Sequence, residues 1–97
     1  MRSEIEIDAG IDEVWDALAT EDGRSEWLDD EQEREIRVES ADPPHRLVWW
    51  WWEGDQPATR VEFLVVPAVS GTRVVVIESS PSVPLAMLSA RFAMVAA

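Results

Sequence analysis

The amino-acid sequence predicts an α+β fold in which helices cover one face of an antiparallel sheet. Three observations predict this class: an alternating segment followed by a helical pattern, further strand-like segments joined by short turns, and a final apolar stripe of helical spacing. Short connections favour antiparallel pairing of consecutive strands. With 97 residues, the chain is expected to form one domain, residues 1–97, around one compact core.

The first part of the sequence contains one predicted strand and two predicted short helices. Residues 3–8 alternate strictly between acidic or polar and apolar side chains, which is typical of a half-buried strand. Residues 11–18 carry apolar side chains at i, i+3, i+4 and i+7, which form one face of a helix. A second short helix is expected over residues 21–28, with Trp27 at its end.

Four strands and a terminal helix are expected in the rest of the chain. Turns rich in proline and glycine separate the predicted strands, which cover residues 33–40, 46–53, 59–66 and 72–78. Apolar residues then recur at spacings of 3, 4 and 3, which predicts a helix with one apolar stripe: Leu85, Leu88, Phe92 and Val95.

Four consecutive tryptophans, residues 49–52, lie in one of these strands. Successive side chains of a strand point to opposite faces, so Trp49 and Trp51 share a face with Phe63, which we expect the terminal helix to cover. One layer of helices covers only one face. The opposite face is therefore expected to be the interface of a homodimer, formed by Trp50, Trp52, Leu64, Val66, Val75 and Ile77. The alternative is that the short helices, arginine side chains and chain ends cover it.

Composition excludes several classes of function. The chain has 20 acidic residues, 8 arginines and no lysine, and its net charge of −12 argues against binding to nucleic acid or to anionic membranes. Without cysteine it has neither disulfides nor thiolate metal ligands. It shows no apolar segment of about 20 residues and no signal-peptide pattern, which favours a cytoplasmic protein.

Few residues are suited to catalysis. There is no Cys, Lys or Tyr, so an activated nucleophile has no evident base, and we assign no catalytic residue. Glu78 is the one candidate, because its position in the strand points it toward the helix side, where burial would raise its pKa. The alternative is that Glu78 reaches water at the strand end. A pairing of Glu78 with Arg91 is a further possibility.

No cofactor or metal site is predicted. His45 follows a Pro-Pro turn and is expected to be exposed rather than catalytic. Acidic residues cluster between the second helix and the next strand, but without the spacing of a calcium loop they favour a solvated loop: Asp29, Asp30, Glu31 and Glu33.

The ordered motifs of the chain resemble the START-like, SRPBCC superfamily. Within it they are most similar to the group named after the activator of the heat-shock-protein-ninety ATPase. The motifs are EIDAGIDEVWDAL, TEDGRSEWL, DPPHRLVWWWW, ATRVEFLV and GTRVVVIES, which cover most of residues 3–80. The matching positions are Trp15, Trp27, Pro43, Pro44, Leu47, Gly71 and Thr72.

The resemblance implies a helix-grip fold, in which a curved antiparallel sheet grips a long C-terminal helix around an apolar cavity. Only eight residues separate Trp27 from Ile36, where the family usually carries an extra hairpin, so about five strands are expected. The terminal helix is also short, at about 13 residues. The missing hairpin would leave an unprotected strand edge, which again favours a dimer.

Three functions remain open at this point. The first is a non-enzymatic module that binds a small apolar or aromatic molecule through Trp15, Trp27, Trp49, Trp51, Phe63, Val76, Leu88 and Phe92. In the alternative interpretation, Trp15 and Trp27 only anchor the core. The second is a polyketide cyclase or aromatase that uses Glu78. The third is a protein-interaction or co-chaperone-like module without a ligand.

Overall fold

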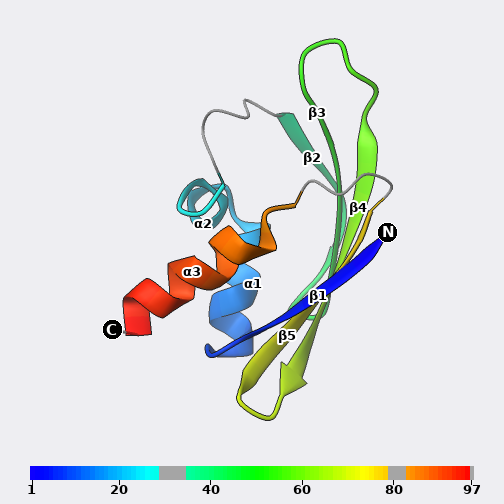
Figure 1. Ribbon diagram of the computed structural model, residues 1–97. Helices are drawn as coiled ribbons and strands as arrows, with labels where there is room; N and C mark the ends of the chain where they lie inside the picture. Colours follow the sequence, from blue (N-terminus) through cyan, green and yellow to red (C-terminus); the bar gives the residue numbers. More distant parts are fainter. Residues whose placement is uncertain (29–34, 79–82, 97) are drawn as a thin grey trace.

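A computed structural model describes residues 1–28, 35–78 and 83–96, which form one five-stranded sheet and three helices (Figure 1). The elements are β1 (Arg2–Ile7), α1 (Ile11–Ala19), α2 (Glu21–Ser25), β2 (Glu35–Asp42), β3 (Arg46–Trp52), β4 (Thr59–Ala68), β5 (Gly71–Glu78) and α3 (Leu85–Ala96). The predicted order of elements is confirmed. Within these described ranges, no helix is both long and apolar enough to span a membrane.

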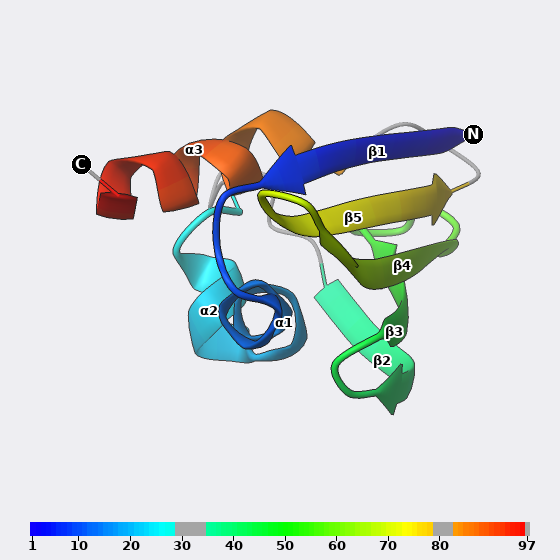
Figure 2. The ribbon, with the colours of Figure 1, turned by 90° about the horizontal axis from the view of Figure 1, so that it is seen from below.

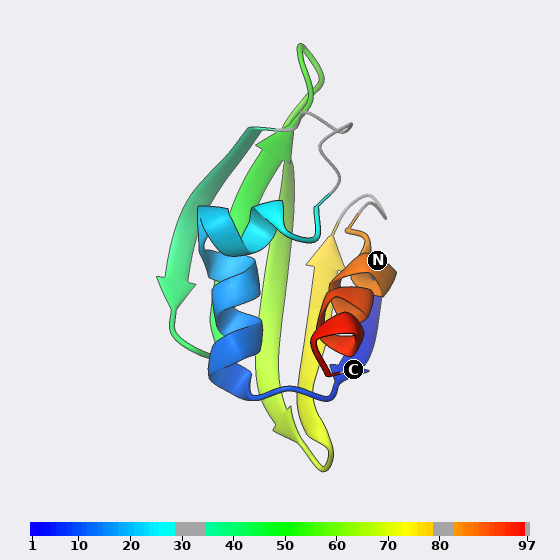
Figure 3. The same cartoon turned by 90° about the vertical axis from the view of Figure 1, so that its left-hand side faces the viewer.

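All neighbouring strands of the sheet are antiparallel, in the order β1-β5-β4-β3-β2. Strands β2 to β5 form the predicted meander. Strand β1 pairs with β5, the last strand, so β1 and β2 lie at opposite edges of the sheet (Figure 3). The chain therefore crosses from one edge to the other between these two strands, and α1 and α2 lie on this crossing.

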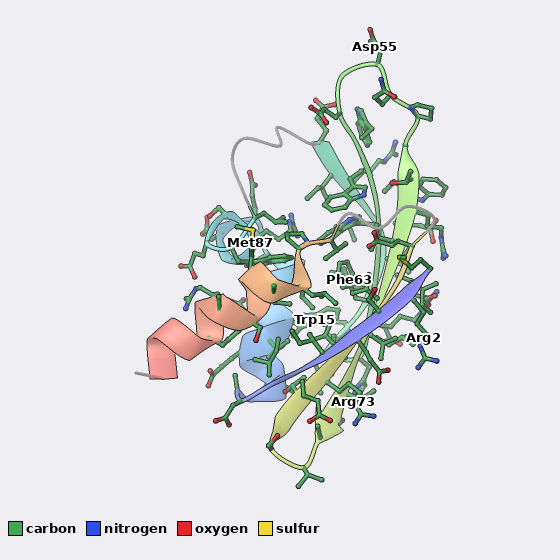
Figure 4. All side chains as sticks on the ribbon, in the orientation of Figure 1. Arg2, Trp15, Asp55, Phe63, Arg73 and Met87 are labelled. Atoms are coloured by element: carbon green, nitrogen blue, oxygen red, sulfur yellow. The ribbon has the colours of Figure 1, made fainter. Side chains whose placement is uncertain are left out.

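The helices lie on one face of the curved sheet, which we call the inner face (Figures 1 and 2). Helix α1 contacts β4 and β5, and α3 contacts β1. The first part of α3 lies near the sheet and its C-terminal end points away from it (Figure 1). None of the described helices lies on the opposite, outer face. Phe63 lies between the sheet and the helices, and Arg2 and Arg73 lie on the outer side (Figure 4).

Helix α2 is shorter than the predicted 21–28 because the chain turns inward after Ser25. The backbone N–H groups of Trp27 and Leu28 both donate to the carbonyl oxygen of Arg24. The indole of Trp27 can then reach α1, where its Nε1 donates to the Ala17 carbonyl at 2.7 Å. This hydrogen bond satisfies a buried donor and fixes the end of α2 against α1.

The turn between β4 and β5 packs tightly against the end of β1. Gly71 has a φ of +150°, and a Cβ added there would lie 2.2 Å from the carbonyl oxygen of Ile7. Next to it, the buried Thr72 donates its hydroxyl to the Ala9 carbonyl at 2.8 Å. Glycine is required here both by the backbone angle and by the close approach. These contacts fix the point where the chain leaves the sheet toward α1.

Candidate ligand-binding site

The four consecutive tryptophans divide between the two faces as their alternation predicts. Trp49 is 0% exposed and Trp51 is 2% exposed, and both belong to the core on the inner face. Trp50 and Trp52 lie on the outer face and are half-buried. The strand β3 therefore contributes two large rings to the space between the sheet and the helices.

Three of the inner rings form an aromatic cluster, which consists of Trp49, Trp51 and Phe63. The centroids of the Trp49 and Phe63 rings are 4.6 Å apart in an edge-to-face arrangement. The rings of Trp49 and Trp51 are 5.6 Å apart with an angle of 49° between their planes. Both separations lie in the range that favours aromatic pairs. The rings thus form a continuous aromatic surface on the inner face.

The other residues predicted to contact a ligand surround this cluster. Val76, Leu88 and Phe92 are buried in the same core, and Trp15 packs against it from α1 while remaining half-buried. Trp27 is also buried, but its indole N–H already donates to Ala17. The structure therefore gathers all eight side chains around one core, and it gives Trp27 an anchoring contact of its own.

Trp49 contains a buried donor that no described residue pairs with. Among the residues that the structure describes, no acceptor lies within hydrogen-bonding distance of its Nε1. Buried polar groups are normally hydrogen-bonded, and leaving one unsatisfied costs about 1–3 kcal/mol. The indole N–H of Trp49 is therefore a position at which a bound molecule could supply the missing acceptor.

Arg24 of α2 lies directly beside this ring, and the sequence did not single it out. Its guanidinium carbon is 5.6 Å from the centroid of the Trp49 ring, close enough for a cation–π contact. Its Nη1 donates to the carbonyl of Leu18 at 3.0 Å. Burial lowers the pKa of Arg24, and the nearby charge of Glu21 opposes that shift. Sequence patterns place Arg24 on a short helix but do not tell where its long side chain goes.

The inner face reaches solvent at its β2 edge. Val38 is paired with Trp49 across the β2–β3 ladder, and it is 41% exposed although it points to the inner face. Directly opposed residues of antiparallel strands have Cα atoms roughly 4.5–5.5 Å apart. The solvent-exposed edge of the inner face is thus one strand away from Trp49.

Glu78 is the one carboxylate that the described strands place on the inner face. It is only 6% exposed, so the interpretation that it reaches water at the strand end is wrong. Its Oε1 accepts a hydrogen bond of 3.4 Å from the backbone N–H of Val83. Arg91 does not pair with Glu78; it pairs with Glu26 at the end of α2, its Nε donating to Oε2 at 2.7 Å.

The remaining polar candidates lie away from the aromatic cluster. His45 is exposed, as predicted, and its backbone N–H closes the turn by donating to the Asp42 carbonyl. Within the described parts of the chain, no three His, Asp or Glu residues lie close enough together to hold a metal ion. The predicted acidic loop lies outside the described residues: Asp29, Asp30, Glu31 and Glu33.

The outer face is less apolar than the alternation suggests. Val66 and Ile77 are each 39% exposed, Trp50, Trp52 and Leu64 are half-buried, and Val75 is buried. Charged side chains lie between these residues in ion pairs that join different strands: Arg73–Glu6 at 2.6 Å and Arg46–Glu62 at 2.5 Å between neighbouring strands, and Arg60–Glu39 at 3.3 Å between β4 and β2, across β3. The predicted interface residues thus share one face, but salt bridges divide them.

Comparisons with known proteins identify the fold. No protein-family model matches the chain, and no curated protein matches it. Solved structures do match. DynU16, described as a protein of the dynemicin biosynthetic locus, has a TM-score of 0.69 and 21% identity over 99% of this chain. A structural-genomics target from Rhodobacter sphaeroides has a TM-score of 0.71 and 16% identity, covering 96% of this chain and 86% of its own.

The Aha1 dimer from Colwellia psychrerythraea also matches, with a TM-score of 0.68 and 18% identity over 97% of this chain and 87% of that chain. The chain has a helix-grip fold, which it shares with these solved structures. This confirms the fold that the sequence motifs implied. The chain spans 42% of the DynU16 chain, and identities this low carry information about the fold alone.

Proposed function

We propose that this domain binds a small apolar or aromatic molecule between its inner face and its helices, without converting it chemically. The observation that carries the proposal is Trp49, which is fully buried in an aromatic cluster while its indole N–H has no acceptor among the described residues. Aromatic surfaces with a few convergent polar groups are typical of small-molecule sites. The exposed Val38, one strand away, marks the side from which a ligand would enter.

Two similarities support this proposal. The fold is that of a superfamily whose members often enclose an apolar cavity between sheet and helix. One structural neighbour, DynU16, is described as a protein of the dynemicin biosynthetic locus. The cyclase or aromatase alternative depends on Glu78, and that carboxylate already accepts a hydrogen bond from the backbone of Val83.

The test compares two adjacent tryptophans on opposite faces. Isothermal titration with 2-naphthol, a neutral aromatic probe with a hydroxyl group, should show saturable binding to the wild-type protein. Trp49→Phe removes the buried N–H and should weaken binding by about tenfold, the cost of one lost hydrogen bond in a buried site. Trp50→Phe makes the same change on the outer face and should leave the affinity unchanged. Absence of binding, or equal effects of both variants, would contradict the proposal.

We also propose that the outer face forms a homodimer interface. The face bears no helix, exposes Val66 and Ile77, and carries the half-buried rings of Trp50 and Trp52. A structural neighbour of similar length is described as a dimer. Sedimentation velocity should give the mass of a dimer for the wild-type protein and of a folded monomer for Trp50→Ser or Trp52→Ser. A wild-type monomer, or association that both variants retain, would rule out this interface.

A further inference from the structure

Arg24 is a cation inside an acidic protein. It is half-buried on the helix side of the structure, its guanidinium faces the Trp49 ring, and one of its nitrogens donates to the Leu18 carbonyl. A guanidinium has five N–H donors, so this single hydrogen bond leaves most of them without a protein acceptor among the described residues.

The other described arginines show that this arrangement is unusual for the chain. Five of the seven described arginines form an ion pair with a glutamate: Arg2, Arg46, Arg60, Arg73 and Arg91. Arg37 forms none, but it is exposed and can be solvated. Arg24 alone among them is half-buried without an ion pair, in a sequence with 20 acidic residues. Its missing partner is therefore not explained by a shortage of carboxylates.

Arg24 and Trp49 are thus in contact, and each has at least one N–H group without an acceptor among the described residues. The indole N–H of Trp49 belongs to the ring that the Arg24 guanidinium faces, and no described acceptor reaches it. A carboxylate has two oxygens that can accept from a guanidinium and a neighbouring N–H at the same time. A neutral apolar molecule would leave Arg24 without an ion pair among the described residues.

Building on the proposed binding function, we propose that the ligand is an aromatic carboxylic acid. Its ring system would contact the aromatic cluster, and its carboxylate would bind to Arg24 and the indole N–H of Trp49. Burial disfavours the charged form of Arg24. An anionic partner would therefore stabilise this charge more strongly here than on the surface.

The test uses two probes that differ only in charge at one group, 2-naphthoate and 2-naphthamide, titrated calorimetrically at pH 7 and 0.15 M salt. The wild-type protein should bind 2-naphthoate at least about tenfold more tightly than 2-naphthamide, because hydrogen bonds to charged groups are the stronger ones. Arg24→Gln should abolish this preference while 2-naphthamide still binds. Arg37→Gln removes an equal charge at an exposed site and should preserve the preference.

A folding control accompanies the substitution. Arg24→Lys keeps the positive charge and the aliphatic stem, so it should retain part of the preference for 2-naphthoate, and circular dichroism establishes that each variant is folded. Equal binding of both probes by the wild-type protein would contradict the proposal that Arg24 binds the carboxylate of the ligand. A preference for 2-naphthoate that survives in folded Arg24→Gln would contradict it as well. Either result would leave the proposed binding function intact. If neither probe binds to the wild-type protein, both proposals fall together.

Discussion

Adjacent residues of β3 have different partners because they point to opposite faces. The indole of Trp49 is inside the core, and the indole of Trp50 donates to Glu39 Oε1 at 2.9 Å on the surface of the sheet. Arg60 adds a second contact to the same carboxylate at 3.3 Å. Both donors lower the pKa of Glu39. The hydrogen bond from Trp50 is the larger cause, and the hydrogen bond from Arg60 is the next.

This pKa shift gives a prediction at the level of one residue. Trp50→Phe should raise the pKa of Glu39 toward the ordinary glutamate value of about 4.3, because the largest cause of the shift is removed. Trp52→Phe, two residues along on the same face, should leave it unchanged. An NMR titration of the Glu39 side chain measures both, and an unaltered pKa in Trp50→Phe would show that the hydrogen bond does not act on Glu39.

The lowered pKa of Glu39 also predicts how the stability of the fold changes in acid. A carboxyl group whose pKa is lower in the folded state stabilises the fold above its unfolded pKa, and this contribution is lost as the pH falls through the folded pKa. Glu39 therefore contributes near neutral pH and stops contributing in acid. Trp50→Phe should weaken the pH dependence of the urea midpoint in that acid range.

What the sequence predicted about single residues depended on regular structure. Alternation along β3 assigned Trp49 and Trp51 to the core correctly, because a strand fixes the direction of each side chain. Alternation also placed Glu78 of β5 on the helix side; only the alternative, that it reaches water at the strand end, was wrong, because Glu78 is buried. Arg24 was missed because its position depends on the packing of α2 against α1, which no local pattern encodes.

At the level of elements, the turn between β4 and β5 should be the most sensitive to added bulk. Gly71→Ala should destabilise the fold by roughly 2–4 kcal/mol, since it combines an unfavourable φ with a collision against the Ile7 carbonyl. Gly54→Ala is the matched control. It also changes a positive φ, of +54°, but nothing lies within 4 Å, and it should cost about 1 kcal/mol. Chemical denaturation compares them, and equal costs would contradict the tight turn.

Strands and helices were predicted from periodicity, and short turns predicted the pairing of β2 to β5, but the partner of β1 was not predicted. The pairing of β1 with β5 joins residues that are far apart in the sequence, such as Ile5 and Val74, and no local signal specifies it. The end of α2 was placed too late because the inward turn is fixed by the Trp27–Ala17 hydrogen bond, a tertiary contact. The edge strand β2 carries a register shift between Val38 and Ser40, a feature that protects strand edges from pairing.

At the level of the whole molecule, the two faces of the sheet differ in composition. The inner face concentrates aromatic rings and an indole N–H that has no acceptor among the described residues, and the half-buried Arg24 of α2 lies beside them. On the outer face, apolar residues alternate with ion pairs whose members come from all five strands. We infer that small-molecule recognition belongs to the inner face and self-association to the outer face.

The most direct test of this division uses protein labelled with 5-fluorotryptophan, whose six tryptophans give separate ¹⁹F NMR signals that single Trp→Phe variants assign. On titration with 2-naphthoate, the signals of Trp49 and Trp51 should shift with a common saturation curve, while those of Trp50 and Trp52 stay in place. Shifts confined to Trp50 and Trp52, or none at all, would contradict the account that the inner face binds the ligand.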